Sequence, residues 1–225
     1  FSIGNQVEEA IEIHQDIPKR SIVQGALEVL RKVNIPAAES RVKDYPHQMS
    51  GGMRQRVVGA IGISCQPQVL IADEPTTALD VTVQAQVLVL LKNLTERLNM
   101  GLLLITHDLG IVQRMADHVY VMTDGRLVEN NSTDALFASP SHEYTKHLLA
   151  AEPSGKPDPI PEKARNVLSV NDIKVWFPIK RGVLRRTIGH IKAVDGIDVR
   201  VREGHTVGVV GESGSGKTTL AMGLL

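Results

Sequence analysis

One octapeptide near the end of the sequence restricts the possible folds more than any other segment. Residues 211–218 read Gly-Glu-Ser-Gly-Ser-Gly-Lys-Thr and match the phosphate-loop pattern G-x-x-x-x-G-K-[ST] at every position. Such a loop lies between a buried strand and a helix, because its curled backbone and the helix start both turn N–H groups toward one anion. The apolar run 206–210 suits that strand, so we expect an α/β fold.

The side chains of this loop indicate which anion it would take. Lys217 would reach the β- and γ-phosphates of ATP, and the hydroxyl of Thr218 would ligate Mg²⁺. The other positions of the loop expected to bind ATP are Gly211, Ser213, Gly214, Ser215, Gly216 and Thr219. The alternative is a glycine-rich turn without a ligand, but the apolar run before the loop favours phosphate binding.

Short apolar runs earlier in the chain predict further strands. Residues 69–72 and 102–105 are continuous apolar runs, which are typical of strands buried on both faces of a parallel sheet. Residues 119–122 predict another strand, which meets a turn at Asp124-Gly125.

Helical patterns fill much of the sequence around these runs. Apolar residues recur at helical spacing through 7–30, with Pro18 as a break between two helices. Ser50-Gly51-Gly52 opens another helix, which must end by Pro67. Residues 83–98 carry the apolar stripe of a long amphipathic helix. Strands alternating with helices again indicate an α/β layered domain.

Polar residues stand directly after two of the strand candidates. Asp73 and Glu74 follow the first run, and His107 follows the second. The carboxyl ends of parallel strands are where α/β proteins place their sites. We therefore expect Asp73 to hold Mg²⁺ and Glu74 to polarise an attacking water as general base. The alternative is a structural role at a helix start, and Asp108 is suited to cap the helix after His107.

The order of three segments resembles the second half of an ABC-type nucleotide-binding domain. The segments are SGGMRQR, VLIADEPTTALD and LLLITHDLG, which resemble the signature motif, the Walker B strand with the D-loop, and the switch-histidine segment. SGGMRQR and ADEPTTALDVTVQAQ are most similar to ATPases of the dipeptide, oligopeptide and nickel importers. The resemblance implies that Ser50, Gly51 and Gly52 contact ATP, that Asp80 is the D-loop acid, and that His107 contacts the γ-phosphate.

The last part of the chain resembles the opening of a second domain of the same type. The segments KAVDGIDV and GVVGESGSGKTT carry this likeness. The resemblance thus implies a P-loop NTPase with two fused domains. Residues 1–150 would be the C-terminal part of the first domain and 167–225 the N-terminal part of the second. The intervening segment 151–166, rich in proline and charge, would be a linker.

Several departures from the family pattern bear on this interpretation. Met49 and Met53 stand where many members have Leu and Gln, and the cysteine cluster of some members is missing. The first domain has no P-loop, the second has no signature, Walker B or switch histidine, and neither has a Q-loop. Because the chain begins at Phe1 rather than Met and ends at Leu225, soon after the P-loop, we expect both ends to be cut.

Family geometry implies a head-to-tail arrangement in which each ATP lies between two domains. Lys217 would then share one ATP with Ser50-Gly51-Gly52, while Asp73, Glu74 and His107 would serve the other. The magnesium ligands Thr218 and Asp73 would accordingly lie at different ATP sites. The resemblance also places Phe177 where the family stacks an aromatic ring on adenine; the alternative for this strand residue is a place in the core.

Bulk properties exclude several functional classes. Lys plus Arg and Asp plus Glu both number 25, so the zero formal charge argues against a strongly basic nucleic-acid-binding surface. The single cysteine excludes an internal disulfide and a multi-cysteine metal site. No apolar run approaches the roughly 20 residues that span a bilayer. A local basic run, Lys180-Arg181 with Arg185-Arg186, is either a solvated hairpin or a contact for anionic lipid.

The function implied by the resemblance is that of an ATP hydrolase energising a bacterial peptide-type importer. It would lie peripherally on the cytoplasmic face of the plasma membrane, with membrane-embedded permease subunits and a substrate-binding protein as partners and no nucleic acid. One alternative is a soluble tandem ABC ATPase acting on the ribosome or DNA, against which the short linker argues. Others are an inactive fragment and a permuted single domain. The transported substrate cannot be read from this sequence.

Overall fold

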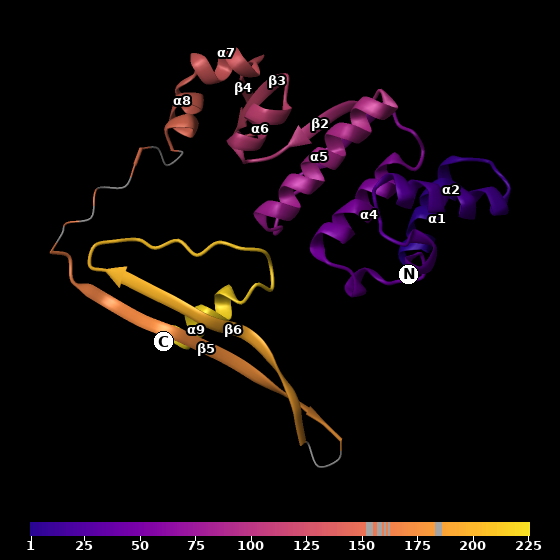
Figure 1. Cartoon of the computed structure of the whole chain (residues 1–225). Helices are drawn as coiled ribbons and strands as arrows, with labels where there is room; N and C mark the ends of the chain where they lie inside the picture. Colours follow the sequence, from indigo (N-terminus) through magenta and orange to yellow (C-terminus); the bar gives the residue numbers. More distant parts are fainter. Residues whose placement is uncertain (152–154, 157–158, 160, 162, 183–185) are drawn as a thin grey trace. The chain divides into compact units, whose positions relative to one another are not determined.

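The computed structural model describes residues 1–151, 155–156, 159, 161, 163–182 and 186–225, which form two compact units, Phe1–Ser154 and Gly155–Leu225. Figure 1 labels most of their elements. In chain order these are α1 (Ile3–His14), α2 (Lys19–Lys32), α3 (Ala38–Arg41), the 3-10 helix η1 (Pro46–Gln48), α4 (Gly51–Ile63), β1 (Val69–Asp73), α5 (Val81–Leu98), β2 (Gly101–Ile105), α6 (Leu109–Met115), β3 (His118–Thr123), β4 (Arg126–Ser132), α7 (Thr133–Ala138), α8 (Glu143–Ala150), β5 (Asn166–Arg181), β6 (Arg186–Arg202) and α9 (Lys217–Leu224).

The first helices of unit Phe1–Ser154 confirm the helical pattern of the sequence. α1 begins after Ser2, whose hydroxyl accepts a hydrogen bond from the Asn5 N–H at 3.3 Å. Pro18 separates α1 from α2, as predicted. It is the N-cap residue of α2, a position at which the missing N–H of proline removes no helical hydrogen bond. α4 begins at Gly51 and ends at Ile63, before Pro67.

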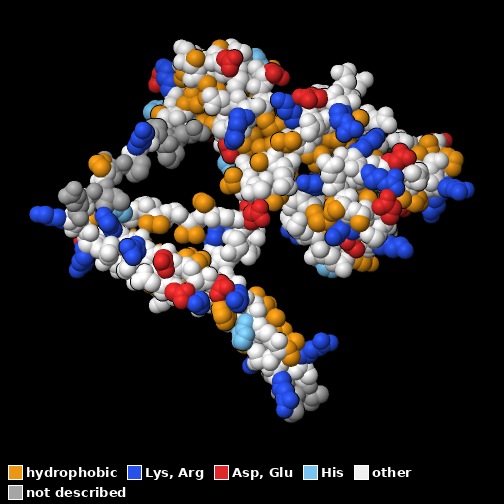
Figure 2. Space-filling model, viewed as in Figure 1, with side chains coloured by type: hydrophobic (Ala, Val, Ile, Leu, Met, Phe, Trp, Pro, Cys, Tyr) orange, Lys and Arg blue, Asp and Glu red, His pale blue; other side chains and the backbone are white. Residues whose placement is uncertain are grey.

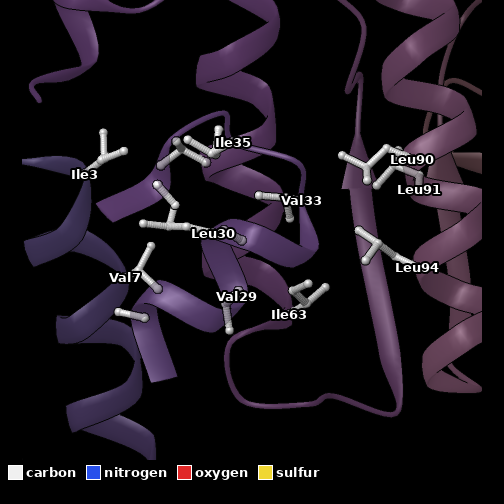
Figure 3. Close-up of a cluster of buried hydrophobic side chains, with 14 of the residues drawn as sticks. Ile3, Val7, Val29, Leu30, Val33, Ile35, Ile63, Leu90, Leu91 and Leu94 are labelled. Atoms are coloured by element: carbon white, nitrogen blue, oxygen red, sulfur yellow. The ribbon is translucent and has the colours of Figure 1, made fainter. Parts of the chain in front are cut away.

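One apolar cluster holds α1, α2, α4 and α5 together with β1 (Figure 3). Ile3, Val7 and Leu30 are fully buried where α1 packs on α2. From the other side α5 contributes a buried stripe, as its sequence predicted: Val87, Leu88, Leu90, Leu91 and Leu94. Burial of side chains of this size supplies most of the stability of such a unit, at roughly 1.5–3 kcal/mol each.

β1 and β2 are parallel neighbours, paired from Val69 with Gly101 to Asp73 with Ile105. The prediction that these strands are buried on both faces is wrong. Burial alternates along β1: Leu70 and Ala72 are buried, whereas Val69 and Ile71 are 57% and 64% exposed. Helices α4 and α5 supply the core on one face, and in the described part of this unit no layer covers the other.

The remaining elements of this unit form around a hairpin. β3 and β4 are antiparallel, and their turn at Asp124-Gly125 has φ of +49° and +71°, the conformation that a tight two-residue hairpin needs. The predicted strand and turn are therefore confirmed. Helix α7 packs on β4 and α6, where Ile111 and Leu136 are buried.

Unit Gly155–Leu225 consists of one long antiparallel ribbon, β5 with β6, and helix α9 packed on it. Figure 1 shows the ribbon extending beyond α9. The helix expected after the phosphate loop is confirmed as α9. Of the expected linker 151–166, the described residues 151, 155–156, 159, 161 and 163–165 have no helix or strand, whereas Asn166 already begins β5. The other linker residues lie outside the described residues.

The strand predicted at 206–210 is not formed. These residues have no regular structure, and Val210 is 94% exposed. An apolar run becomes a strand only when its N–H and C=O groups are paired, and no strand of the described residues pairs with this segment. Composition alone therefore misassigned this segment.

The ribbon also carries the basic run, of which Arg185 lies outside the described residues. Lys180 and Arg181 end β5, and Arg186 begins β6 opposite Arg181. Figure 2 shows Lys and Arg side chains at this end of the ribbon. Among the described helices, none is long and apolar enough to span a membrane.

Candidate functional site

The phosphate loop lies between the irregular segment 206–210 and helix α9, against strand β6. Gly214 and Gly216 have φ of +80° and +91°, in the left-handed region that favours glycine. At Gly216 a Cβ atom would lie 2.2 Å from the carbonyl oxygen of Ala193 in β6, so no side chain fits there without displacing backbone. The glycine pattern thus sets both the curl of the loop and its distance from the ribbon.

The ammonium group of Lys217 bridges this loop. Its Nζ donates hydrogen bonds to the carbonyl oxygens of Gly211 (2.8 Å) and Glu212 (2.6 Å), and it lies 3.3 Å from Oγ of Ser215. All of these acceptors are neutral. Phosphate oxygens are charged acceptors and bind an ammonium more strongly, so a phosphate entering the loop can draw Lys217 away from them.

The two threonines of the loop stand in the first turn of α9. Thr218 is exposed and Thr219 is half-buried, while Leu220 one position later is buried against the ribbon. The first N–H groups of any helix have no acceptor within the helix, so this turn offers donors to an anion. The structure thus places Thr218 beside Lys217 at a helix start, as a metal-and-phosphate role requires.

Phe177 and Trp176 are adjacent on β5 but differ in their surroundings. The Trp176 ring is engaged: its Nε1–H donates to Asp195 Oδ1 at 2.9 Å, and Lys192 Nζ lies 4.4 Å from the ring centroid. Phe177 pairs across the ribbon with Ile191 and is 50% exposed. It is therefore not a core residue within this unit, and an exposed ring is what stacking on a base needs.

The acidic edge of the parallel strand pair, Asp73 and Glu74, forms the second candidate site. Asp73 is the last residue of β1, and Glu74 follows in the left-handed region at φ +44°. The Glu74 N–H donates to the carbonyl oxygen of Ile105 in β2 at 2.8 Å. This bond extends the strand pairing by one residue and fixes the Glu74 backbone at the carboxyl edge of the sheet.

His107 meets Glu74 at this edge, as their positions after adjacent strands predicted. His107 Nδ1 lies 3.0 Å from Glu74 Oε1, and the other carboxylate oxygen, Oε2, accepts a hydrogen bond from the Thr77 hydroxyl at 2.8 Å. The pKa of Glu74 lies below its ordinary value, because the Thr77 hydroxyl and then His107 stabilise the ionised form. The sequence analysis did not single out Thr77, whose hydroxyl is a third group of this site.

The loop carrying His107 is fastened on both sides. Asp108 caps α6, as expected, by accepting from the Ile111 N–H at 3.0 Å. Its other carboxylate oxygen accepts from the Gln84 side chain of α5 at 3.3 Å, and its N–H donates to Thr106 Oγ1. Gln84, which sequence reasoning did not single out, therefore ties α5 to the histidine loop.

Ser50, Gly51 and Gly52 start helix α4 beside the start of α5. The Ser50 hydroxyl accepts from the Met53 N–H at 3.3 Å and so caps the helix. A Cβ on Gly52 would lie 2.3 Å from Cγ1 of Val83, and one on Gly51 would lie 3.1 Å from Cδ2 of Leu79. The glycines are therefore needed for close packing of α4 on α5, whatever else they bind.

Asp80 caps α5 in the same region. Its Oδ1 accepts from the Val83 N–H at 2.9 Å. The residue expected as the D-loop acid thus has a structural role at the helix start that faces Gly52.

The structure divides the predicted site residues between its two units. Asp73, Glu74, Asp80, His107 and the glycine pair of α4 lie in Phe1–Ser154, whereas the phosphate loop and Phe177 lie in Gly155–Leu225. Over the described ranges, no group of three or more His, Cys, Asp or Glu residues could hold a metal ion by itself. The expected magnesium ligands, Asp73 and Thr218, belong to different units.

Comparison with protein families identifies one match. The model of the ABC transporter family matches residues 4–77, which run from α1 to Thr77 and include Ser50, Asp73 and Glu74.

Curated proteins similar to this chain are ATP-binding proteins of transporters. The chain is 55% identical over 223 residues to a peptidoglycan transport ATP-binding protein of Agrobacterium fabrum, covering 99% of this chain and 41% of that protein. It is 41% identical over 251 residues to a glutathione import ATP-binding protein of Escherichia coli K12, covering 100% of this chain and 40% of that protein. The chain therefore spans about two fifths of the length of these relatives.

Solved structures similar to this chain are also transporter ATP-binding components. CbiO1 from Clostridium perfringens, part of an ABC transporter complex, aligns with a TM-score of 0.53 and 28% identity over 61% of this chain and 53% of that one. A bacterial ABC transporter cassette solved as a dimer, MJ0796, aligns with a TM-score of 0.51 and 27% identity over 59% of this chain and 57% of that one. The fold is thus that of the ABC-type P-loop ATPases.

Proposed function

We propose that this chain belongs to the ABC transporter family of ATP-binding proteins and is part of an ATP-hydrolysing subunit that energises solute import. The observation that carries the proposal is the pairing of Glu74 with His107. A carboxylate and an imidazole 3.0 Å apart at the carboxyl edge of a parallel strand pair can together polarise a water beside a phosphate.

We propose further that the chain contains parts of two nucleotide-binding domains. Residues 1–150 are the C-terminal part of one, 151–166 a linker, and 167–225 the N-terminal part of the next. The order of motifs supports this, since the acids at Asp73 and Glu74 come before the only phosphate-loop pattern, at 211–218. The division into two compact units and the two-fifths coverage of longer relatives agree with it.

In this arrangement the two domains pair head to tail with ATP between them. The phosphate loop with Lys217 faces the Ser50-Gly51-Gly52 helix start across one ATP. The second ATP lies between a phosphate loop of the first domain and the group formed by Asp73, Glu74 and His107. The start of α4 supports this assignment, because the first N–H groups of a helix have no acceptor within the helix and can bind an anion.

The residues present fit Mg²⁺ as a cofactor of the bound ATP. Mg²⁺ prefers oxygen ligands and shares them with substrate phosphates, and Thr218 offers a hydroxyl while Asp73 offers an exposed carboxylate at a strand end. When bound, the ion neutralises charge on the phosphates. Lys217 adds a second positive charge there, and Phe177 stacks on the adenine.

Glu74 acts as general base, and His107 orients it toward the γ-phosphate. The carboxylate of Glu74, whose pKa lies below its ordinary value, is ionised at neutral pH and can accept the proton of the attacking water. The left-handed backbone at Glu74, bonded to Ile105, holds the carboxylate at the sheet edge where the strands end.

The substrates of the importer are peptides or related small solutes. The names of two relatives, a peptidoglycan transport protein and a glutathione import protein, support this class, since both solutes contain peptide bonds. The partners are membrane-embedded permease subunits and a substrate-binding protein, with the ATPase peripheral on the cytoplasmic face of the plasma membrane. Zero formal charge supports the absence of nucleic acid among the partners.

The test is ATP turnover by a protein that contains this chain and is as long as the relatives described above. Glu74→Gln keeps size and shape but removes the base, and should lower kcat at least 100-fold at its site while ATP still binds. Lys217→Ala should weaken ATP binding at the other site. Arg186→Gln, on the exposed ribbon end, is the control and should leave both unchanged. Wild-type turnover in Glu74→Gln, measured with the second site inactivated, would contradict the proposal.

A further inference from the structure

Glu74 has both carboxylate oxygens engaged by neighbouring side chains. Oε1 faces His107 Nδ1 at 3.0 Å, and Oε2 accepts a hydrogen bond from the Thr77 hydroxyl at 2.8 Å. Because an ionised carboxylate only accepts hydrogen bonds, the facing nitrogen of His107 must donate. Each oxygen therefore has its own donor, one from the loop after β2 and one from the turn after Glu74 itself.

The backbone of the turn explains how Thr77 reaches the carboxylate. Glu74 has φ of +44°, and the Thr77 N–H donates to the Glu74 carbonyl oxygen at 3.2 Å. This bond closes a tight turn that brings the side chain at i+3 back over the side chain at i. Threonine suits the position because its β-branch restricts χ1 and so limits the directions of its hydroxyl.

We propose that Thr77 is the positioning residue of the general base: its hydroxyl holds the Glu74 carboxylate in the orientation that receives the proton of the attacking water. The proposal rests on the proposed function of Glu74. During hydrolysis the water oxygen bonds to the γ-phosphorus, the bond to the departing ADP oxygen breaks, and the water proton passes to Glu74. A carboxylate free to rotate would spend less time aligned for that transfer.

Thr77 differs from the other groups around Glu74 because it carries no charge. The titratable groups at this edge are His107, Asp73 beside Glu74, Asp108 beside His107, and Asp80 at the start of α5. The Thr77 hydroxyl therefore holds Glu74 Oε2 through a hydrogen bond from a neutral donor.

The first experiment measures the order of the Glu74 side chain directly in this chain, without nucleotide. NMR relaxation and side-chain coupling constants are compared between the wild type, Thr77→Val, which replaces the hydroxyl with a methyl, and Thr77→Ser, which keeps it. We expect the Glu74 side chain to sample several rotamers in Thr77→Val and to keep the wild-type rotamer in Thr77→Ser. An equally ordered Glu74 side chain in Thr77→Val would overturn the proposal, and because no ATP is present the result does not depend on hydrolysis.

The second experiment measures turnover by the complete protein. A hydrogen bond to a charged group of this kind corresponds to roughly a 10-fold to 100-fold effect, so Thr77→Val should lower kcat by at least about 10-fold without changing KM. The acid limb of its pH–rate profile should move to higher pH, and Thr77→Ser should restore both. If Thr77 had a purely structural role, its substitution would lower the amount of folded protein without moving the acid limb of the pH–rate profile.

The outcomes separate this proposal from the proposed function. If Glu74→Gln leaves turnover intact, Glu74 is not the base and the proposed function fails. If Glu74→Gln abolishes turnover while Thr77→Val retains wild-type kcat and pH profile, only the positioning role of Thr77 fails. Thr77→Ala supplies a second variant without a hydroxyl, should Thr77→Val be too poorly folded to assay.

Discussion

Gly52 and Val83 are in contact at the crossing of α4 and α5, with no room for a methyl group between them: a Cβ on Gly52 would lie 2.3 Å from Cγ1 of Val83. Gly52 is buried, and Val83 packs against the main core cluster. The glycine that family likeness assigns to ATP contact is thus also required by packing within the unit.

We expect Gly52→Ala to destabilise the unit Phe1–Ser154 by about 1–3 kcal/mol, the usual cost of inserting a methyl group into a packed contact. Val83→Ala in the same chain should recover part of this loss, because it removes the facing Cγ1. Urea unfolding of the four variants of the cycle measures the coupling.

Gly59 supplies the matched control, since it lies on the same helix and a Cβ there meets no atom within 4 Å. Gly59→Ala should therefore be neutral or stabilising by about 0.5–1 kcal/mol. Equal effects of the two substitutions would show that helix propensity, rather than the Val83 contact, governs Gly52.

Glu129 should make the docking of α8 dependent on pH. This buried carboxylate accepts hydrogen bonds from the N–H and hydroxyl of Ser141 (both 2.8 Å) and from the His142 N–H (3.0 Å). The N–H of Ser141, then the hydroxyl of Thr145 and the N–H of His142, lower its pKa from 4.5 to about 2.

A folded-state pKa below the unfolded value stabilises the protein above the unfolded pKa, and the stabilisation disappears as pH falls through the folded one. The contribution of Glu129 is therefore complete above about pH 4.5 and lost as the pH falls toward 2. The protection factors of the Ser141 and His142 amides against hydrogen exchange should fall across this window in the wild type. In Glu129→Gln they should be low already at neutral pH.

Glu143 is the control carboxylate for this measurement. It lies in the first turn of α8, where it is exposed and pairs with Lys146. Glu143→Gln should leave the exchange of the Ser141 amide and its pH dependence unchanged. Loss of the pH dependence in this variant would show that the terminus of α8, rather than Glu129, causes it.

Gln84 should hold the histidine loop. Its side chain donates to Asp108 Oδ2 at 3.3 Å, so Gln84→Glu would place a second carboxylate against the first. We expect a loss of about 1 kcal/mol in stability and faster exchange of the Ile111 N–H, which Asp108 caps. Gln68→Glu, at an exposed position before β1, adds the same charge elsewhere and should have neither effect.

How far the sequence determined this structure differs between local and long-range features. Pro18, Ser50 and Asp108 fixed helix boundaries through their own backbone or side-chain chemistry, and the structure has these boundaries as predicted. Glu74 and His107 could be placed at one edge because both follow apolar runs that pair as parallel strands.

The failures concern features that depend on neighbours distant in sequence. The segment 206–210 has the composition of a strand but no paired strand beside it, and Ile71 has a core side chain but no layer over it. The Thr77 bond was missed for a different reason. It depends on the left-handed φ of Glu74, a conformation that the residue types at 74–77 do not announce.

The separation of Asp73 and Glu74 from Lys217 into different units leads to the last prediction, that this chain alone does not hydrolyse ATP in steady state. Hydrolysis needs phosphates, magnesium and base at one site, and under the proposed pairing the base Glu74 and the phosphate loop with Lys217 serve different ATP molecules. ATP binding requires fewer of these groups, and the phosphate loop is complete within one unit. ATP should therefore perturb the amide resonances of 211–219, and Lys217→Ala should abolish that change. Phosphate release above background that requires Mg²⁺ and is lost in both Glu74→Gln and Lys217→Ala would show instead that the two motifs act on one nucleotide.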